Sequence, residues 1–307
     1  MMTDTGVENP ERTVLPADYP PAPDNQIIYA IGDIHGRLDL LEQVHKLIDR
    51  DKARTPWWQG ARRHAERKSP ASPVTRESAN ARDGRPSRNG ILRRPFDPLS
   101  ELPSDCLLPR LEPAVLEIYL GDYIDRGDNP RAVVELLIER AQKTKTVFLR
   151  GNHEQFLLEF MAGTLDFSIW KQVGAFPTLR SYGIQVGQFG FSPSQNALRS
   201  ALEKALAPKH GRFYSDTVPY YVAGPYLFVH AGVRPGISLE QQHPEDLMGI
   251  RRQFLEFEGN LGHVVVHGHT PAREPEFKRN RINVDTGAYS TGRLTCLRIG
   301  PDGPRVL

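Results

Sequence analysis

Short apolar runs that stop at a glycine alternate with apolar residues at helical spacing along the first half of the chain. The run at residues 27–31 stops at Gly32, and residues 38–51 then repeat leucine, valine and isoleucine three or four positions apart. A second run at residues 115–118 precedes an amphipathic segment from 130 to about 143, which has proline in its first turn. Because strands favour short apolar runs and helices repeat every 3.6 residues, we predict two buried strands, each followed by a helix.

The remainder of the chain contains more strand patterns than helix patterns. Helical spacing covers about 154–181, 195–206 and 244–257. Strands are expected at about 146–150, 218–222, 226–229, 264–267, 281–284 and 294–299. Strands and helices alternate early and strands dominate late, which predicts an α/β sandwich of two sheets packed between helices.

Two segments lack both patterns. Residues 1–25 hold five prolines and few large apolar side chains, which predicts a flexible N-terminal tail. In residues 52–95, twelve Lys and Arg face three Asp and Glu. We interpret about 52–113 as a basic low-complexity insertion within a single domain that spans 26–307. Its charge would suit an acidic partner, but its tryptophans are bunched at one end, so a nucleic acid is not indicated and a solvated loop is the simpler interpretation.

Composition agrees with a soluble globular protein, with 39% hydrophobic and 25% charged residues and a net charge of +2. No apolar run is long enough to span a membrane. The N-terminal residues have neither the basic start nor the apolar stretch of a signal peptide, and two cysteines are too few for a disulfide framework. These features predict a cytoplasmic protein without a membrane partner.

Five expected strands end in loops that carry Asp, Asn and His. The loops read Gly-Asp-Ile-His-Gly at 32–36, Gly-Asp-Tyr-Ile-Asp-Arg-Gly at 121–127, Gly-Asn-His-Glu at 151–154, His-Ala-Gly at 230–232 and His-Gly-His-Thr at 267–270. Ligands collect beyond the carboxyl ends of strands in α/β sheets, so these side chains are expected to meet at one site. Oxygen and nitrogen donors without a thiolate suit Mn²⁺, Fe or Zn²⁺.

At least six residues of these loops could bind metal: Asp33, His35, Asp122, Asn152, His230 and a histidine of the last loop. One ion that keeps an open position rarely takes so many ligands, whereas two ions that share a bridging carboxylate would use them all. Two ions about 3.5–4 Å apart form a clamp for in-line attack on phosphorus and supply hydroxide near neutral pH. Arg126 lies in the second loop, and its planar guanidinium suits a phosphoryl group.

The motifs GDIHG, GDYIDRG and GNHE, in this order, resemble the signature of the phosphoprotein phosphatase (PPP) family of metallophosphoesterases, and HAG, HGHTP and INVDTGAYSTGRLTCLRIG continue it. The resemblance runs from residue 27 to about 299, apart from 52–113. It is greatest to the bacterial serine/threonine-phosphatase-like branch, which adjoins the symmetrical diadenosine tetraphosphate hydrolases. It implies a calcineurin-like α/β sandwich with two mixed sheets flanked by helices, and a serine/threonine protein phosphatase with two divalent metal ions, Mn²⁺ before Fe or Zn²⁺.

The resemblance also implies a role for each matching residue. The first metal would be bound by Asp33 and His35, both metals by Asp122, and the second metal by Asn152, His230 and His269. His153 would protonate the leaving oxygen, and Asp125 would orient its imidazole. Arg126 would bind the phosphate, and so would Arg251, although Gly249 stands where the family usually has tryptophan.

Two other functions remain open besides phosphomonoester hydrolysis. One is a symmetrical diadenosine tetraphosphate hydrolase that uses the same site, and the other is a non-catalytic metal-binding scaffold. No cysteine or serine stands at a nucleophile position in the motifs, so a phosphoenzyme is not expected. His45, in the first predicted helix, and His267 are interpreted as structural histidines.

Overall fold

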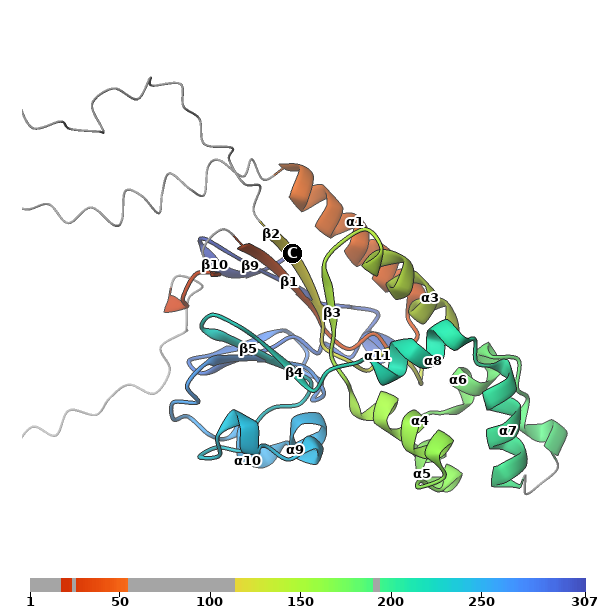
Figure 1. Cartoon of the computed structure of the whole chain (residues 1–307). Helices are drawn as coiled ribbons and strands as arrows, with labels where there is room; N and C mark the ends of the chain where they lie inside the picture. The colour runs from red at the N-terminus through yellow and green to blue at the C-terminus, as the bar shows by residue number, and fades with distance from the viewer. Residues whose placement is uncertain (1–17, 24–25, 55–113, 190–193) are drawn as a thin grey trace, which may run out of the picture. The chain divides into compact units, whose positions relative to one another are not determined.

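The computed structural model describes residues 18–23, 26–54, 114–189 and 194–307, which belong to one compact unit of the chain (Figure 1). Most of the predicted tail and of the basic insertion therefore lie outside the described residues. Two sheets flanked by helices make up the described part and confirm the predicted α/β sandwich. A search of this part finds no helix that combines the length and the apolar character needed to cross a membrane.

The first sheet has the strand order β10-β9-β1-β2-β3. Its strands are β1 (Gln26–Ile31), β2 (Ala114–Tyr119), β3 (Thr146–Phe148), β9 (Cys296–Gly300) and β10 (Gly303–Val306). β1, β2 and β3 run parallel, whereas β9 and β10 are antiparallel additions. β10, which contains Gly303 and Pro304, is not predicted by the hydrophobic pattern. It pairs only with β9, and an edge strand tolerates proline because one side needs no N–H donor.

The second sheet has the order β4-β5-β6-β8-β7. Its strands are β4 (Tyr220–Ala223), β5 (Tyr226–Val229), β6 (Val264–His267), β7 (Glu276–Lys278) and β8 (Arg281–Asn283). The central strands β5, β6 and β8 are parallel, and the edge strands are antiparallel to them. Three parallel strands in each sheet place three carboxyl ends at a common edge, where the motif loops begin.

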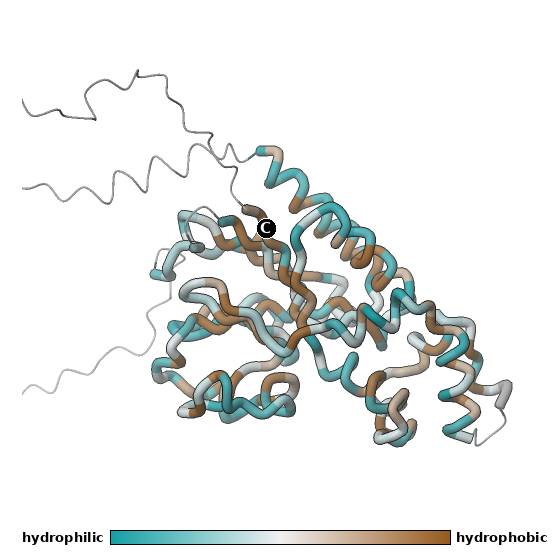
Figure 2. Tube along the Cα trace, viewed as in Figure 1, coloured by the Kyte–Doolittle hydropathy of each residue, from teal (hydrophilic) through white to brown (hydrophobic). Residues whose placement is uncertain are grey.

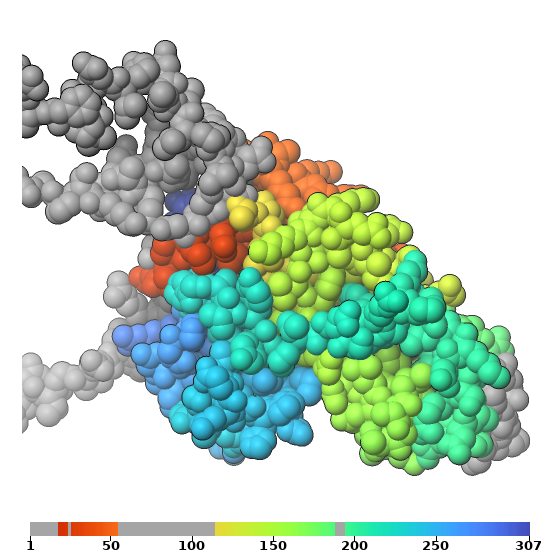
Figure 3. Space-filling view, in the orientation of Figure 1, coloured from red at the N-terminus to blue at the C-terminus, as the bar shows by residue number. Residues whose placement is uncertain are grey.

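Helices cover both sheets and extend to one side of them. They are α1 (Leu38–Arg54), α3 (Pro130–Ala141), α4 (Asn152–Ala162), α5 (Phe167–Val173), α6 (Phe176–Ser181), α7 (Gln195–Ala205), α8 (Pro208–Ser215), α9 (Pro244–Gly249), α10 (Arg252–Leu255) and α11 (Ala288–Thr291), with 3-10 turns η2 (Val186–Phe189) and η3 (Leu239–Gln241). In Figure 1, α1 and α3 lie along the first sheet and α9 and α10 below the second. The space-filling view shows an indentation between α9–α10 and α4–α5 (Figure 3).

Two helices predicted as continuous are broken. The stretch predicted at about 154–181 forms α4, α5 and α6, because Gly163 and Gly174 adopt the left-handed conformation that ends a helix. Pro177 then stands in the first turn of α6, where its missing N–H costs nothing. The helix predicted at 244–257 divides into α9 and α10 because Ile250 turns to an extended backbone and Arg251 is not helical.

Apolar side chains form separate layers on the two faces of the first sheet. Ile28 and Ala30 of β1 face the second sheet and pack in one cluster with Phe228 and Val266. The alternate residues of β1, such as Tyr29, pack in another cluster with the helices. The hydropathy colouring shows mostly apolar residues along the central strands and a mixture of polar and apolar residues along the outer helices (Figure 2). A strand buried on both faces explains why the sequence of β1 is apolar throughout.

The end of the predicted tail is packed rather than flexible. Tyr19 and Ala22 are buried; the Tyr19 hydroxyl donates to the Lys278 carbonyl at 2.7 Å, and the Ala22 N–H donates to the Gly300 carbonyl at 3.0 Å. The flexible-tail prediction is therefore wrong for residues 18–23. The number of prolines did not reveal that this segment packs. Tyr19 and Ala22 bury apolar surface, which offsets the entropy cost of ordering the segment.

A buried ion network lies between α1, α3 and the first sheet. Glu117 in β2 is fully buried and accepts hydrogen bonds from Lys52 at 2.7 Å, from Arg140 at 2.7 and 2.9 Å, and from the Tyr119 hydroxyl at 2.8 Å. Nε2 of His45 lies 2.9 Å from the same hydroxyl, in agreement with a structural role. Lys52 is part of α1, so the insertion begins later than the predicted residue 52.

Candidate active site

The motif loops of both sheets converge at one place. Asp33 and His35 follow β1, Asp122 follows β2, and Asn152 and His153 begin α4 after β3. His230 follows β5, and His269 follows β6. Backbone hydrogen bonds join the loops in pairs: the His35 N–H donates to the Asp122 carbonyl at 2.8 Å, and the Gly268 N–H donates to the His230 carbonyl at 2.8 Å. The predicted convergence of the strand ends is thus present in the structure.

Backbone strain marks the same place. Five non-glycine residues of the described chain have positive φ, between 46° and 66°, and all were predicted as site residues: His35, Asp122, Asp125, Arg126 and His269. Such conformations cost about 1–3 kcal/mol each and persist where the surrounding structure enforces them, most often at functional sites. The fold therefore holds these side chains in position at a cost in conformational free energy.

Gly151 shows how tightly these loops pack. A Cβ atom on this residue would lie 2.2 Å from Oδ1 of Asp122 and 2.4 Å from the Asp122 backbone nitrogen. Any larger residue would displace Asp122. The glycine of the Gly-Asn-His-Glu motif is therefore required by close approach of the second and third loops.

Asp122 is the central carboxylate of the site. Its Oδ2 lies 3.4 Å from Nε2 of His35, and its Oδ1 lies 3.4 Å from Nε2 of His230. Two clusters of candidate metal-binding atoms share it: His35, Asp122 and His153 form one, and Asp122, His230 and His269 form the other. Asp122 is therefore placed to contribute to two ions, although the first cluster contains His153, the predicted acid, and not Asp33.

Hydrogen bonds fix the imidazoles in the orientation needed for metal binding. Nδ1 of His35 donates to the Ile124 carbonyl at 2.9 Å, and Nδ1 of His230 donates to the Leu120 carbonyl at 2.8 Å. The other nitrogen, Nε2, then carries the lone pair and faces Asp122. Burial lowers the pKa of both histidines, to about 3 for His35, so the rings are neutral at pH 7.

The remaining candidate ligands surround Asp122. Oδ1 of Asn152 lies 3.1 Å from Nε2 of His230 and 2.9 Å from Nδ1 of His269. Burial lowers the pKa of His269 to about 3, which leaves its ring neutral. Oδ2 of Asp33 accepts the His269 N–H at 3.0 Å. Burial would raise the pKa of Asp122, but the four surrounding imidazoles of His230, His153, His35 and His269 hold it below the ordinary value.

The residues present fit divalent metal ions. Oδ1 of Asp33 is buried and has no hydrogen-bond partner in the described part of the protein. An unsatisfied buried carboxylate oxygen is costly unless a cation meets it. The donors are two carboxylates, one amide oxygen and three neutral imidazoles, and such a set suits Mn²⁺, Fe or Zn²⁺.

His153 and Asp125 form a separate buried pair. Nδ1 of His153 donates to Oδ2 of Asp125 at 2.7 Å, and both side chains are fully buried. Oδ2 also accepts the Trp170 indole N–H at 2.8 Å, and Oδ1 accepts the Thr178 hydroxyl. Burial alone would lower the pKa of His153, but the charges of Asp122 and Asp125 and the hydrogen bond to Asp125 raise it above the ordinary value. This ring therefore differs from its neighbours and can carry a proton.

Two arginines lie at the edge of this cluster. Nη2 of Arg126 lies 3.2 Å from Nε2 of His153, and its guanidinium lies over the Tyr289 ring at 4.6 Å. Arg251 is exposed, and its guanidinium lies 3.4 Å from the His269 carbonyl and 3.5 Å from the Thr270 hydroxyl, both long distances for a hydrogen bond. Both predicted phosphate arginines are thus next to the candidate metal ligands. Glycine in place of tryptophan at 249 has not removed Arg251 from the site.

Two buried acids of the site, Glu154 and Asp285, were not among the predicted site residues. Glu154 accepts the backbone N–H groups of Gly151, Asp122 and Tyr123 at 2.8–3.0 Å and so joins the second and third loops. Burial raises the pKa of Glu154 to about 8. Asp285, in the VDTG segment, lies beside Asp33, and burial raises its pKa to about 6. A strand followed by Asp, Thr and Gly was the available signal for Asp285, because the other motifs have the same form.

His267, interpreted as structural, lies outside the candidate metal clusters. Its Nδ1 lies 3.0 Å from the Gly268 carbonyl and its Nε2 lies 3.5 Å from Nη1 of Arg281, and the ring packs against Phe254. These contacts hold β6 and β8 together, in agreement with the sequence interpretation.

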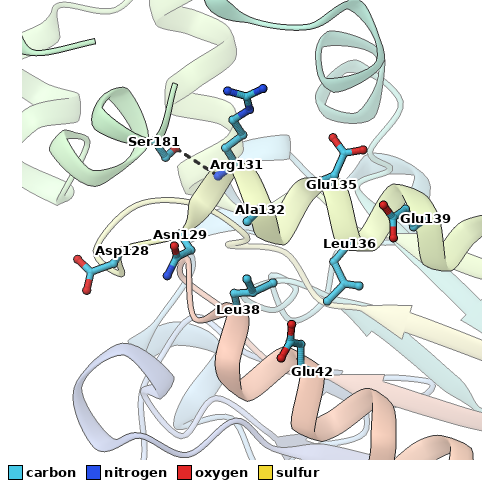
Figure 4. Close-up of a pocket in the computed structure, with 10 residues that line it drawn as sticks. All are labelled: Leu38, Glu42, Asp128, Asn129, Arg131, Ala132, Glu135, Leu136, Glu139 and Ser181. Atoms are coloured by element: carbon cyan, nitrogen blue, oxygen red, sulfur yellow. Dashed lines mark hydrogen bonds between the residues drawn. The ribbon is translucent and has the colours of Figure 1, made fainter. Parts of the chain in front are cut away.

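A separate hollow of about 480 Å³ lies between the beginnings of α1 and α3 (Figure 4). Its polar lining is mainly acidic, and none of the candidate ligands contributes to it: Leu38, Glu42, Asp128, Asn129, Arg131, Ala132, Glu135, Leu136, Glu139 and Ser181. Asp128 and Asn129 therefore face away from the metal cluster although they follow Arg126 closely in sequence.

Residues 105–302 match the calcineurin-like phosphoesterase family. The chain belongs to this family. The matched span includes every candidate ligand except Asp33 and His35, which precede it. The members of this family are metallophosphoesterases, so the chain is an enzyme that hydrolyses phosphoesters with divalent metal ions. The PPP subdivision is a narrower statement, which the family match leaves open.

Curated relatives carry a more specific name. The chain is 27% identical over 202 residues to bis(5'-nucleosyl)-tetraphosphatase PrpE [asymmetrical] of Anoxybacillus flavithermus, with 59% of this chain and 74% of the relative covered. It is 30% identical over 188 residues to the protein of the same name of Bacillus thuringiensis, with the same coverage. Among solved structures, a cold-active protein-tyrosine phosphatase of a psychrophilic Shewanella aligns over 92% of this chain and 80% of that chain, at 14% identity and a TM-score of 0.44.

Proposed function

We propose that the converging loops form a two-metal phosphoesterase site. Asp33 and His35 would hold one ion, Asp122 both ions, and the second ion would be bound by Asn152, His230 and His269. Two ions held by these residues would supply Lewis acidity for a phosphoryl group and would lower the pKa of bound water. The unsatisfied Asp33 oxygen, the neutral imidazoles and the central position of Asp122 support this assignment. Mn²⁺ is the first choice for both positions.

His153 is proposed as the general acid. Its Nδ1 proton is held by Asp125, so Nε2 is the atom that faces the site and can give a proton to the leaving oxygen. The Trp170 and Thr178 hydrogen bonds keep Asp125 in place and leave it no freedom to turn away. Asp125 is thus a positioning residue that acts through the imidazole.

Arg126 and Arg251 are proposed to bind the phosphoryl oxygens. Arg126 shares its surroundings with His153, so a group held by this guanidinium lies within reach of the proposed acid. Among the residues that the structure describes, the Arg251 guanidinium has hydrogen-bond contacts of 3.4–3.5 Å, so little has to be broken before it binds an anion. Guanidinium groups offer paired donors that match two phosphoryl oxygens.

We propose phosphomonoesters of alcohols, such as phosphoserine and phosphothreonine in proteins, as the substrates. The buried His153–Asp125 pair is the observation that carries this proposal. An alkoxide is a poor leaving group and gains most from a positioned acid, whereas a nucleotide phosphate leaves readily without one. A site built for the second kind of leaving group alone would have less need of this pair.

Hydrolysis rates of His153→Asn test the assignment. The variant should lose far more activity on a phosphoserine peptide than on an aryl phosphate with a good leaving group, both measured with added Mn²⁺. Equal losses on the two substrates would remove His153 from the role of acid. Full activity in Asp122→Asn would contradict the metal site itself.

Dinucleoside tetraphosphate hydrolysis is the second candidate, and the names of the relatives favour it. Product analysis with diadenosine tetraphosphate distinguishes asymmetrical from symmetrical cleavage. Asymmetrical cleavage, the kind that the name of the relatives specifies, would give AMP and ATP, whereas the symmetrical cleavage considered from the sequence would give two ADP. A kcat/KM for diadenosine tetraphosphate that exceeds those for all phosphopeptides would replace the protein phosphatase proposal.

A further inference from the structure

The two sheets touch directly beside Asp33. A Cβ atom on Gly32 would lie 2.5 Å from the Val284 carbonyl oxygen and 3.6 Å from the Asp285 nitrogen. Only glycine permits this approach. The end of β1 in the first sheet therefore lies against the end of β8 in the second, and the residues that follow each contact, Asp33 and Asp285, are brought together.

Local hydrogen bonds hold Asp285 in this position. Oδ1 of Asp285 accepts the Gly287 N–H at 2.8 Å, and the Asp285 N–H donates to Oδ1 of Asn283 at 3.0 Å. Gly287 has φ of 65°, which suits glycine. Asp285 is only 2% exposed, so its side chain cannot turn out to solvent.

Asp33 is equally enclosed and is not satisfied by the protein. It is 2% exposed; Oδ2 accepts the His269 N–H, and Oδ1 has no partner in the described part of the chain. Within the same part, neither Asp33 nor Asp285 forms an ion pair with a lysine or arginine. Two adjacent buried carboxylates that form no such ion pair repel each other when both are charged, and a bound cation would remove that repulsion.

We infer that Asp285 is a seventh residue of the metal centre: placed beside Asp33 by the Gly32 contact, it contributes negative charge to the first ion, the one proposed for Asp33 and His35. The inference rests on the proposed two-metal site and deepens it. Nε2 of His230 lies 3.1 Å from Oδ1 of Asn152 and 3.4 Å from Oδ1 of Asp122, whereas Asp33 accepts the His269 N–H; Asp285 should therefore affect the second ion less than the first.

Calorimetric titration of the metal-free full chain with Mn²⁺ tests the inference. The unmodified protein should bind two ions. Asp285→Asn keeps an oxygen for the Gly287 N–H but removes the charge, and should weaken one of the two affinities by about 10–100-fold, as supporting residues of metal sites commonly do. Asp285→Ser also removes the charge and should weaken the same Mn²⁺ affinity. This second variant keeps the test decisive if Asp285→Asn does not fold.

Thermal unfolding gives a readout that a merely structural residue would not reproduce. In the metal-free state Asp285→Asn should be at least as stable as the unmodified protein, because a repulsion is removed, whereas with Mn²⁺ it should be less stable. Glu117→Gln, at a buried carboxylate far from the loops, is the control and should lose stability in both states without a change in Mn²⁺ affinity.

The outcomes separate the two proposals. No Mn²⁺ binding by the unmodified protein would overturn the proposed metal site. Two ions bound by the unmodified protein with both affinities unchanged in Asp285→Asn and Asp285→Ser would overturn the inference alone. Equal destabilisation of Asp285→Asn with and without Mn²⁺, at unchanged affinities, would also overturn it, because Asp285 would then serve only the fold.

Discussion

Asp125→Asn tests whether this buried carboxylate acts on the reaction only through His153. In the structure, Oδ2 of Asp125 accepts from His153 at 2.7 Å and from Trp170 at 2.8 Å, and Oδ1 accepts from Thr178. Asparagine can keep its oxygen toward His153 and Trp170 and turn its amide toward the Thr178 hydroxyl oxygen. The fold should therefore persist at a cost of about 1–3 kcal/mol, while the imidazole loses its anionic partner.

The expected losses follow from the role of each group. A positioned general acid contributes typically about 10²–10⁴-fold, so His153→Asn should lower kcat/KM for a phosphoserine peptide by this factor, or about 3–5 kcal/mol. Asp125→Asn should lower it less, by about 10–10³-fold, because the imidazole is still present. If Asp125 acts only through His153, the double variant should be no slower than His153→Asn alone.

The assay measures kcat/KM of the unmodified protein, the two single variants and the double variant at saturating Mn²⁺, together with a thermal melt of each. Asp128→Asn is the matched control, because this exposed carboxylate belongs to the same loop and faces the separate hollow between α1 and α3. It should change kcat/KM by less than about twofold, since surface substitutions away from a site have small effects. Multiplied losses in the double variant would refute the reasoning, because Asp125 would then act on the reaction independently of His153.

Three other perturbations test stability. Glu117→Gln removes the charge that pairs Lys52 and Arg140 and should lower the free energy of unfolding by about 3–5 kcal/mol in urea; an unchanged midpoint would contradict this. Burial lowers the pKa of His45 to about 4, so between pH 6.5 and 4 the unfolded state binds a proton that the folded state does not. The free energy of unfolding should therefore fall by up to about 3 kcal/mol over this pH range. His45→Gln should make this fall smaller, and the same pH profile of stability in the variant and the unmodified protein would contradict the prediction. At a Mn²⁺ concentration a hundredfold above Kd, each bound ion stabilises the folded state by about 2.7 kcal/mol, so removing two ions by chelation should lower Tm by about 10–20 °C; an unchanged Tm would contradict metal binding to the folded state.

The sequence predicts the strands of the sandwich better than its helices. β5 and β6 were predicted at their observed residues because continuous apolar runs bounded by glycine or histidine leave few alternatives. The helix at 154–181 was predicted as one because apolar spacing continues across Gly163 and Gly174, and spacing alone does not report a left-handed backbone. β7 and β10 are short edge strands, which are stabilised by their neighbours rather than by their own residues.

The candidate ligands could also be predicted from short motifs, because their positions depend on where the strands end. Each motif places an acid, amide or imidazole directly after a strand, and parallel strands deliver such residues to one edge whatever the details of packing. Asp122 and His35 were therefore identifiable from the ordered series of loops, although a single Gly-Asp loop would predict a turn. Glu117 was not recognisable as a buried charge, because the partners that stabilise it, Lys52 and Arg140, come from two helices distant in sequence.

Asp285 marks the limit of this local reasoning. It is separated from Asp33 by most of the chain, and the two meet only because Gly32 lets one sheet touch the other. A strand followed by Asp and Gly is common in ordinary turns, so the segment alone does not distinguish a turn from a site. What distinguishes it is the unsatisfied oxygen of Asp33 next to a second buried acid, an arrangement that exists only once both sheets are packed. Motifs can therefore identify the groups that hold each ion, whereas the charge around that ion depends on contacts between sheets.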